Sequence, residues 1–224
     1  MINLTNVYKT YWLGEEKVEA LKNATVEIKK GEYVGILGPS GSGKSTLMHI
    51  IGLLDKPTSG KIELFDKNIA NLSDNEISGL RNRKVGFVFQ QFNLIDKFSI
   101  LENVILPAKY SQEKIDFDPV KRGTELLERF GIGDRANFFP NKISGGQQQR
   151  TAIARSLIMH PDLILADEPT GNIDTKTGNE IMRLLEELNR EMGVTVVIVT
   201  HEPDVAKRTK RQIYVKDGEI VKKL

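Results

Sequence analysis

The sequence predicts an α/β fold built on a mostly parallel β-sheet, and two observations support this. Short, almost wholly apolar runs alternate with segments of helical pattern, which suits strands buried on both faces of a parallel sheet covered by helices. These runs span residues 33–37, 85–89, 163–166 and 194–199. In addition, a glycine-rich loop at 38–45 joins the first run to an apolar-faced helix.

The first third of the chain predicts short strands separated by turns. Residues 2–7 and 24–28 alternate apolar and polar side chains, and a glycine turn at Gly14 lies between them. Residues 61–65 alternate in the same way after a turn at 57–60.

Helix signals dominate the middle of the chain. Ser73 and Glu76 have the spacing of a capping box that opens a short helix toward Arg83. The pattern from 91 to 157 is largely helical, and Pro119 suits the first position of one of these helices. The expected helices lie at 100–106, 119–130 and 144–158.

The alternation of strands and helices returns in the last third. A helix is expected over 177–191, between the last two apolar runs. The last predicted element is a β-hairpin with strands at 212–216 and 219–221, joined by a turn at Asp217-Gly218.

Composition excludes several classes of protein. The 224 residues are 39% hydrophobic and 28% charged, which is ordinary for a soluble globular protein, and the net charge of +2 gives no argument for a nucleic-acid partner. The absence of cysteine excludes disulfides, thiolate zinc sites and thiol catalysis, and it fits the cytosol. We see no signal peptide and no apolar run near the roughly 18 residues of a membrane span. Any membrane part is therefore expected from another chain.

The glycine-rich loop has the spacing G-x-x-x-x-G-K-[ST] of a phosphate-binding loop. Its glycines can turn consecutive N–H groups toward one anion, and the dipole of the following helix points at the same place. Lys44 can then reach the β- and γ-phosphates, and the Ser45 hydroxyl can ligate Mg²⁺. The loop predicts a site for a nucleoside triphosphate, the alternative being a simple connecting loop. Its residues are Gly38-Pro39-Ser40-Gly41-Ser42-Gly43-Lys44-Ser45.

Two carboxylates follow a buried strand, where ligands bind in open α/β sheets. Asp167 is expected to hold Mg²⁺, directly or through water, and Glu168 to polarise the attacking water. His201 follows the run at 194–199 and is the candidate for a further polar group near the γ-phosphate. The alternatives are a polar return to solvent for the carboxylates and a structural or solvated histidine.

The octapeptide Ile143-Ser144-Gly145-Gly146-Gln147-Gln148-Gln149-Arg150 resembles the LSGGQ signature of ATP-binding cassette (ABC) proteins. The other motifs of that family follow in family order over essentially the whole chain. They are the phosphate loop, a glutamine loop at Gln90, the signature, the acidic strand at Asp167-Glu168, a D-loop at Gly171-Asn172-Ile173-Asp174 and a switch histidine at His201. Tyr11 matches the aromatic residue that stacks on adenine, although Trp12 beside it leaves open which ring does so.

The resemblance implies a P-loop NTPase (RecA-like) core with an antiparallel β subdomain and an inserted helical subdomain. It implies a single ABC ATPase domain over 1–224, with an ATP-binding core at 1–90 and 158–224 and a helical signature subdomain at 91–157. It also implies an ATPase of the translocase class in which two chains close head to tail on two ATP molecules. The homodimer would act on an integral membrane permease from the cytoplasmic face of the membrane.

The resemblance assigns roles to individual residues. Catalysis is assigned to Glu168, His201 and Lys44, and Mg²⁺ binding to Ser45, Gln90 and Asp167. ATP binding is assigned to Tyr11, Gly38, Pro39, Ser40, Gly41, Ser42, Gly43, Lys44, Ser45, Thr46, Gln90, Ser144, Gly145, Gly146, Gln147 and Asp174, where the signature residues and Asp174 act on the ATP of the facing chain.

Finer stretches at 87–94 and 166–174 resemble the branch of lipoprotein-release, macrolide-export and antimicrobial-peptide-resistance ATPases. That branch implies export or extraction, and leaves the substrate, the permease and the direction of transport open. Two alternatives remain: a machine that transmits force to a membrane partner without translocation, and a soluble ABC ATPase. A kinase or GTPase is argued against by the signature and by the lack of an N-K-x-D guanine-binding motif.

Overall fold

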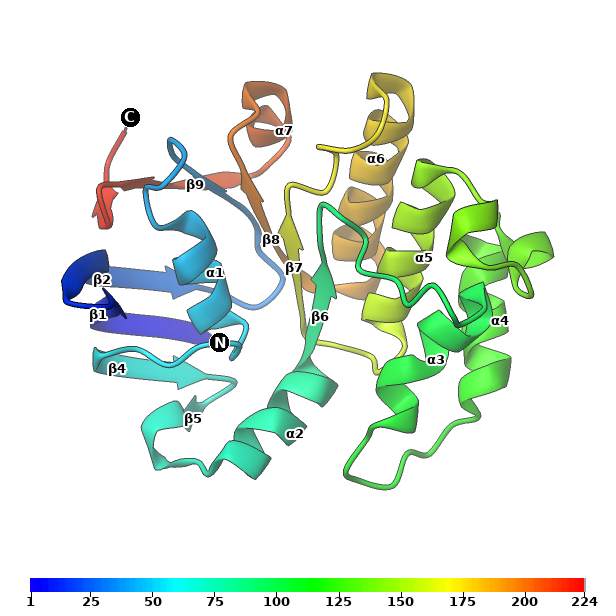
Figure 1. Ribbon diagram of the computed structural model, residues 1–224, viewed down its shortest axis with the longest axis horizontal. Coiled ribbons are helices and arrows are strands. Elements are labelled where there is room, and N and C mark those ends of the chain that lie inside the picture. The colour runs from blue at the N-terminus through cyan, green and yellow to red at the C-terminus, as the bar shows by residue number, and fades with distance from the viewer. Residues whose placement is uncertain (224) are drawn as a thin grey trace. The chain divides into compact units, whose positions relative to one another are not determined.

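The computed structural model describes residues 1–223, apart from the side chain of Leu13, and it divides into two compact units. Unit 1 contains Met1–Ser78 and the chain from Thr195 onward, and unit 2 contains Gly79–Val194. Figure 1 shows their helices and strands.

The first sheet of unit 1 is antiparallel, in the order β2-β1-β4-β5. It consists of β1 (Ile2–Leu13), β2 (Glu16–Ile28), β4 (Ser59–Leu64) and β5 (Lys67–Asn68). The short strands expected before residue 30 are in fact one long hairpin. Its outer part was hidden from sequence analysis because residues 14–19 are exposed and show no apolar alternation.

The second set of strands in unit 1 includes the strand that leads into the phosphate loop. The buried strand β3 (Tyr33–Leu37) lies between the parallel strands β8 (Thr195–Thr200) and β9 (Arg211–Lys216), and β10 (Glu219–Val221) closes a hairpin with β9. This hairpin is the one predicted, and Asp217 and Gly218 have the positive φ angles that such a two-residue turn needs. Two helices belong to this region, α1 (Lys44–Ile51) and α7 (Pro203–Lys207).

Unit 2 holds a parallel pair of strands and most of the helices. The strands β6 (Val85–Val88) and β7 (Leu163–Asp167) pair in register, with Val88 opposite Ala166. The helices are α3 (Ile100–Lys109), α4 (Pro119–Arg129), α5 (Gly145–Leu157) and α6 (Thr175–Met192), and α2 (Asp74–Lys84) spans the boundary between the units. Short 3₁₀ helices occur at Ile69–Asn71, Gly133–Arg135 and Pro140–Lys142.

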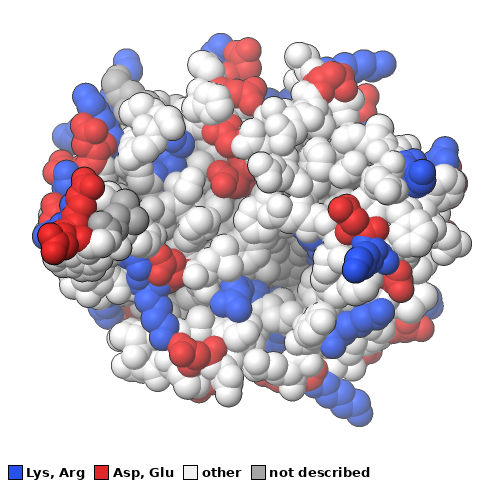
Figure 2. Space-filling view, viewed as in Figure 1, with Lys and Arg blue, Asp and Glu red and all other residues white. Residues whose placement is uncertain are grey.

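The predicted α/β fold with parallel strands is confirmed. Two of the predicted helix starts are also present in the structure. Ser73 and Glu76 bond reciprocally at the start of α2, and Pro119 opens α4. The division into an ATP-binding core and a helical signature subdomain stays a prediction. Among the described residues, no helix combines the length and the apolar character needed to cross a bilayer. Acidic and basic side chains are interspersed on the face shown in Figure 2, as the net charge suggests.

Candidate functional site

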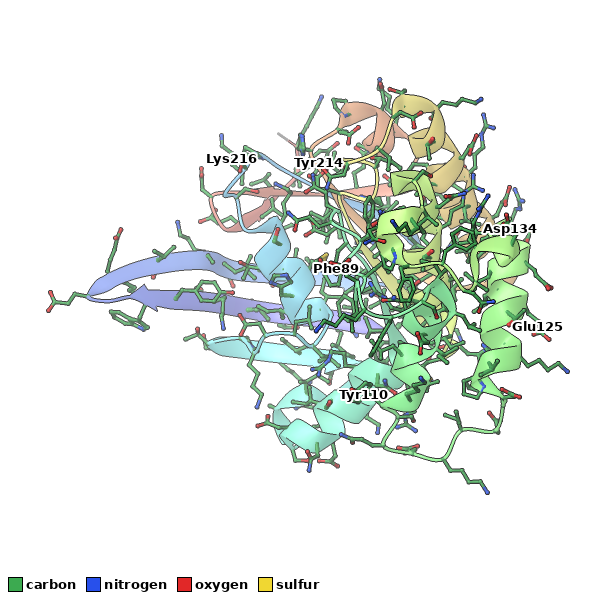
Figure 3. The ribbon with its side chains drawn as sticks, turned by 45° about the vertical axis from the view of Figure 1, so that its right-hand side comes forward. Phe89, Tyr110, Glu125, Asp134, Tyr214 and Lys216 are labelled. Atoms are coloured by element: carbon green, nitrogen blue, oxygen red, sulfur yellow. The ribbon has the colours of Figure 1, made fainter. Side chains whose placement is uncertain are left out.

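The phosphate loop follows the C-terminal end of β3, beside the C-terminal end of the neighbouring strand β8. Leu37 pairs with Thr200 of β8 and with Tyr214 of β9, so Gly38 and His201 begin from neighbouring strand ends. Both residues line one open cavity of about 610 Å³, together with Tyr214 and Lys216. Tyr214 and Lys216 belong to β9 and are labelled in Figure 3. Unit 1 thus brings the predicted switch histidine to the phosphate loop. His201 is exposed in this arrangement.

Two glycines of the loop pack against backbone atoms, which explains their residue type. A Cβ at Gly38 would lie 2.0 Å from the carbonyl oxygen of Val215, and one at Gly43 would lie 2.4 Å from that of Ala20. The Gly218 N–H also donates to the Ser42 carbonyl oxygen at 2.9 Å. The back of the loop is therefore fixed by the backbone of β2, β9 and the following turn.

The front of the loop combines a glycine helix cap, a buried hydroxyl and a buried ammonium. Gly43 caps α1 with a φ of +103°, and as a glycine it offers no side chain to the N–H groups of this helix end. The Ser42 hydroxyl is buried and has no hydrogen-bond partner among the described residues. The Lys44 ammonium is nearly buried and donates to the Pro39 carbonyl oxygen at 2.8 Å. A buried cation beside uncapped N–H groups forms a cradle suited to an anion.

Tyr11 and Trp12 differ sharply in their surroundings. The Tyr11 hydroxyl donates to Asp55 at 2.7 Å, and the Asp55 N–H donates to the His49 carbonyl oxygen of α1 at 3.3 Å. Burial, assisted by Asp55, raises the pKa of the Tyr11 hydroxyl. The side chain of Trp12 is 67% exposed. Of the two rings, only Tyr11 is therefore held beside the helix that starts in the phosphate loop.

In unit 2, Gln90 and the two carboxylates emerge at the same edge of the parallel pair. Gln90 follows β6, Glu168 follows β7, and Asp167 is the last residue of β7. A Cβ at Gly171 would lie 2.6 Å from the Gln90 side-chain nitrogen, and the Asn172 amide donates to the Gln90 carbonyl oxygen at 3.0 Å. The structure thus brings Gln90, the acidic pair and the start of the D-loop together.

Glu168 has a left-handed backbone, with a φ of +45°. This conformation is uncommon for a residue with a side chain, and such strain concentrates at functional sites. The Gly171 N–H donates to the Glu168 carbonyl oxygen at 3.1 Å, closing the turn. Sequence analysis found Glu168 from its position after the strand, but it gave no sign of this backbone strain.

Ser144 opens α5 through a complete capping box. Its hydroxyl oxygen accepts from the Gln147 N–H at 3.3 Å, and its own N–H donates to the Gln147 side chain at 3.0 Å. The hydroxyl hydrogen of a capping serine remains able to donate. A Cβ at Gly146 would lie 2.4 Å from Thr177, so this glycine is needed for packing. The atoms nearest to a Cβ at Gly145 would lie 3.6 Å or more away, which is an ordinary contact distance. Packing within unit 2 therefore does not explain why this residue is a glycine.

Asp174 caps α6 and accepts from the Thr177 N–H at 3.0 Å. Hydrogen bonds from the side chain and backbone of Thr177 hold the pKa of the Asp174 carboxyl below its ordinary value. The carboxylate therefore has a structural task inside unit 2, whatever it contacts beyond it.

Two side chains on α5 that sequence analysis missed organise this region. The buried Gln149 donates to the Pro169 carbonyl oxygen at 2.6 Å, which ties α5 to the turn after β7. Arg155 donates to the carbonyl oxygens of Phe92 and Asn93, at 2.7 and 2.5 Å. Burial lowers the pKa of Arg155 to about 10, so the guanidinium stays charged at neutral pH. Neither role could be predicted from the sequence, because a glutamine within a run of three and an arginine on a helix match no motif with a defined residue spacing.

A model of the family described as "ABC transporter" matches residues 21–171. This stretch is more than half of the chain and contains the phosphate loop, Gln90, the signature and both carboxylates. The chain belongs to the ABC transporter family. It contains the ATPase domain of that family, as the signature predicted.

Relatives of this ABC protein are similar over nearly its whole length. It is 53% identical over 223 residues to an uncharacterized ABC transporter ATP-binding protein of Methanocaldococcus jannaschii, MJ0796, covering 98% of this chain and 95% of that protein. It is 52% identical to the macrolide export ATP-binding/permease protein MacB of Chlorobaculum tepidum, covering 99% of this chain. The chain spans only about a third of the length of that MacB protein, 34%.

A solved structure is also similar to this ABC cassette. The dimeric structure of the cassette MJ0796 in a post-hydrolysis state, bound to ADP and Pi, matches with a TM-score of 0.89 at 52% identity. The match covers 98% of this chain and 96% of the other. The predicted P-loop NTPase fold is thereby confirmed.

Proposed function

We propose that the chain is an ATP-hydrolysing subunit that works as a homodimer and drives a separate integral membrane permease. One observation carries the proposal: the phosphate loop presents an uncapped helix N-terminus, with Lys44 and the buried Ser42 hydroxyl beside it. The relation to an MJ0796 cassette solved as a dimer with ADP and Pi supports both hydrolysis and dimer formation.

The residues of unit 1 fit a triphosphate with a base. Gly41 has a φ of +76°, and nothing lies within 4 Å of a Cβ at that position, so backbone N–H groups can approach an anion closely. Lys44 would neutralise charge on the β- and γ-phosphates, and His201 would donate a hydrogen bond near the γ-phosphate. Pro39, Ser40 and Thr46 would complete the binding loop, and Tyr11 would stack on the base.

The donor set for Mg²⁺ consists of oxygens, which this ion prefers. Ser45, Gln90 and Asp167 would hold it, and when bound it would neutralise charge on the phosphates. Glu168 would accept a hydrogen bond from the attacking water, orient it and take up its proton. The strained backbone of Glu168 supports this role, because it is maintained by the turn around Gly171.

The signature residues would act on the ATP of the second copy. Ser144 can still donate its hydroxyl hydrogen, and Gly145 has no packing reason inside unit 2, which leaves its backbone open to a ligand. Gly146 and Gln147 would support this helix end, and Asp174 would align the facing site. The match to a dimeric cassette supports this arrangement.

The relatives' names support the proposal of a membrane partner and of export. Similarity to MacB proteins, named as macrolide export ATP-binding/permease proteins, supports a permease and macrolide export. Lipoprotein release and antimicrobial-peptide efflux are the other activities that the resemblance of residues 87–94 and 166–174 implies. The chain would then lie on the cytoplasmic face of the membrane. A machine that transmits force without translocation, or a soluble ABC ATPase, is the alternative, and no nucleic-acid partner is expected.

The test uses Glu168→Gln, which should bind ATP, fail to hydrolyse it and accumulate as a dimer that light scattering detects. Lys44→Ala is the matched control and should stay monomeric because it loses most of its affinity for ATP. A Glu168→Gln variant that remains monomeric at saturating ATP would contradict the dimer model.

The same trapped variant identifies the partner. Glu168→Gln held with ATP is captured from native membranes, and the bound proteins are identified by mass spectrometry. Recovery of a polytopic membrane protein, absent from the Lys44→Ala capture, supports the permease. Recovery of soluble partners alone would overturn the transporter assignment and leave the ATPase chemistry standing.

A further inference from the structure

One carboxylate in unit 1 binds two residues of β1 at once. Asp55 accepts from the Lys9 ammonium at 2.6 Å through one oxygen and from the Tyr11 hydroxyl at 2.7 Å through the other. Lys9 and Tyr11 lie on either side of a register shift in the pairing of β1 with β2, and both side chains reach this one carboxylate. The side chains of Lys9 and Asp55 are 12% and 28% exposed, which makes this more sheltered than an ordinary surface ion pair.

The same cluster limits the orientation of the Tyr11 ring. The Lys9 ammonium lies 4.8 Å from the centre of the ring, over one of its faces, and it also donates to the Lys56 carbonyl oxygen at 2.8 Å. This cation–π contact occupies that face and strengthens as water is excluded. A planar base can therefore stack only on the opposite face. With the hydroxyl fixed and one face covered, the ring cannot swing freely about its side-chain torsions.

Asp55 is itself fixed to the helix that begins in the phosphate loop. Its N–H donates to the His49 carbonyl oxygen of α1 at 3.3 Å. Figure 1 shows the β1–β2 hairpin beside this helix. The Tyr11 hydroxyl is thus linked to α1 through Asp55.

Electrostatics agree with a stable carboxylate at this position. Burial tends to raise the pKa of Asp55, but hydrogen bonds from Lys9 and Tyr11 outweigh it and hold the pKa below its ordinary value. Asp55 is therefore ionised at neutral pH and accepts strong, charge-assisted hydrogen bonds.

We propose that Asp55 is a positioning residue that holds Tyr11 ready to stack on a nucleobase, with Lys9 as its second support. The clamp places the aromatic ring at a fixed position relative to the phosphate loop. A ligand that carries both a planar base and a triphosphate gains affinity, because less freedom is lost when it binds. The inference rests on the proposed function, in which Tyr11 is the base platform.

The competing explanation is that Asp55 and Lys9 only close the turn after α1. The two explanations differ in which ligand is affected. A structural defect in α1 would weaken every ligand of the phosphate loop, whereas loss of the clamp would weaken only ligands that carry a base.

The test compares ATP with tripolyphosphate, which lacks the base, by isothermal titration calorimetry in the presence of Mg²⁺. Asp55→Ala should lose about tenfold in affinity for ATP, a usual size for loss of one aromatic–base contact, and keep its affinity for tripolyphosphate. Asp55→Asn retains an acceptor for the Tyr11 hydroxyl and should lose less. Asp74→Ala removes an exposed carboxylate that pairs with Lys56 and should change neither ligand.

A double substitution shows whether Asp55 acts through Tyr11. Tyr11→Phe keeps the ring but removes its hydroxyl, so it should weaken ATP alone, and Asp55→Ala should add little to Tyr11→Phe. Equal weakening of ATP and tripolyphosphate in Asp55→Ala, or no change in either, would overturn the clamp. If the wild-type protein binds tripolyphosphate as tightly as ATP, the base platform of the proposed function is wrong as well.

Discussion

The phosphate loop of unit 1 and the Gln90–signature region of unit 2 (residues 90–94, 144–155 and 167–174) keep their shapes by different means. In the phosphate loop, Gly38 and Gly43 lie so close to backbone carbonyl oxygens that a methyl group would overlap them. In the Gln90–signature region, side chains donate hydrogen bonds to backbone carbonyl oxygens. These donors are Gln149, Arg155 and Asn172.

The difference indicates which changes each region tolerates. A loop fixed by close backbone packing is sensitive to any added atom, because packed interiors have little room to yield. A region fixed by side-chain donors is sensitive to a lost donor, because the carbonyl oxygens left behind have no replacement. A rigid phosphate loop suits a ligand that is always bound in one way. A region fastened by separate side chains can be released by breaking a few bonds.

The largest effect is expected from Gly38→Ala. Its Cβ would lie 2.0 Å from the Val215 carbonyl oxygen and 2.6 Å from the Ser42 hydroxyl, so β9 or the loop must move. We expect a loss of about 3 kcal/mol in the free energy of unfolding, at the upper end of overpacking effects, measured by urea denaturation.

Gly41→Ala is the control for this loop. Its φ of +76° strains any side chain, but nothing lies within 4 Å of the added Cβ. It should therefore cost only about 1–2 kcal/mol, the usual penalty of a left-handed backbone. Equal losses in the two variants would show that backbone packing does not fix the loop.

A smaller effect is expected from Arg155→Met, which removes a donor and adds no bulk. Phe92 and Asn93 both have positive φ angles, and their carbonyl oxygens would lose the guanidinium. We expect a loss of about 2 kcal/mol, together with faster amide hydrogen exchange over residues 90–94.

Arg190→Met is the matched control for this variant. The Arg190 guanidinium is 71% exposed and pairs with Glu191 at 3.5 Å, so its loss should change stability by less than about 0.5 kcal/mol. Unchanged exchange at 90–94 in Arg155→Met would mean that the segment keeps its shape without the arginine.

The same comparison explains what could be predicted from the sequence. The phosphate loop was found in full because glycine spacing encodes its backbone directly, and the capping box at Ser144 is likewise local. The contacts of Arg155 and Asp55 join residues more than forty positions apart and have no local pattern. The length of the first hairpin was missed because its exposed part lacks apolar alternation. Local backbone chemistry was predictable, and long-range side-chain bonds were not.

The smallest effect, and the one that distinguishes charge from hydrogen bonding, is expected at the cap of α6. The pKa of Asp174 lies below its ordinary value of 3.8, so its charge stabilises the folded state above about pH 4, and this contribution is lost as the pH falls through the lowered pKa. Asp174→Asn keeps an acceptor for the Thr177 N–H, so thermal unfolding should show it slightly less stable than wild type at pH 7 and equal to it below the folded pKa.

Asp174→Ala removes the acceptor as well and should be less stable than Asp174→Asn at both pH values. A deficit of Asp174→Asn that does not shrink on acidification would mean that the charge is not what stabilises the helix end. The N-cap of α1 is a glycine, which has no side chain to titrate. A pH-dependent stability at the start of α6 would therefore mark a helix end completed by its own carboxylate, in contrast to the start of α1, which we propose binds an anion.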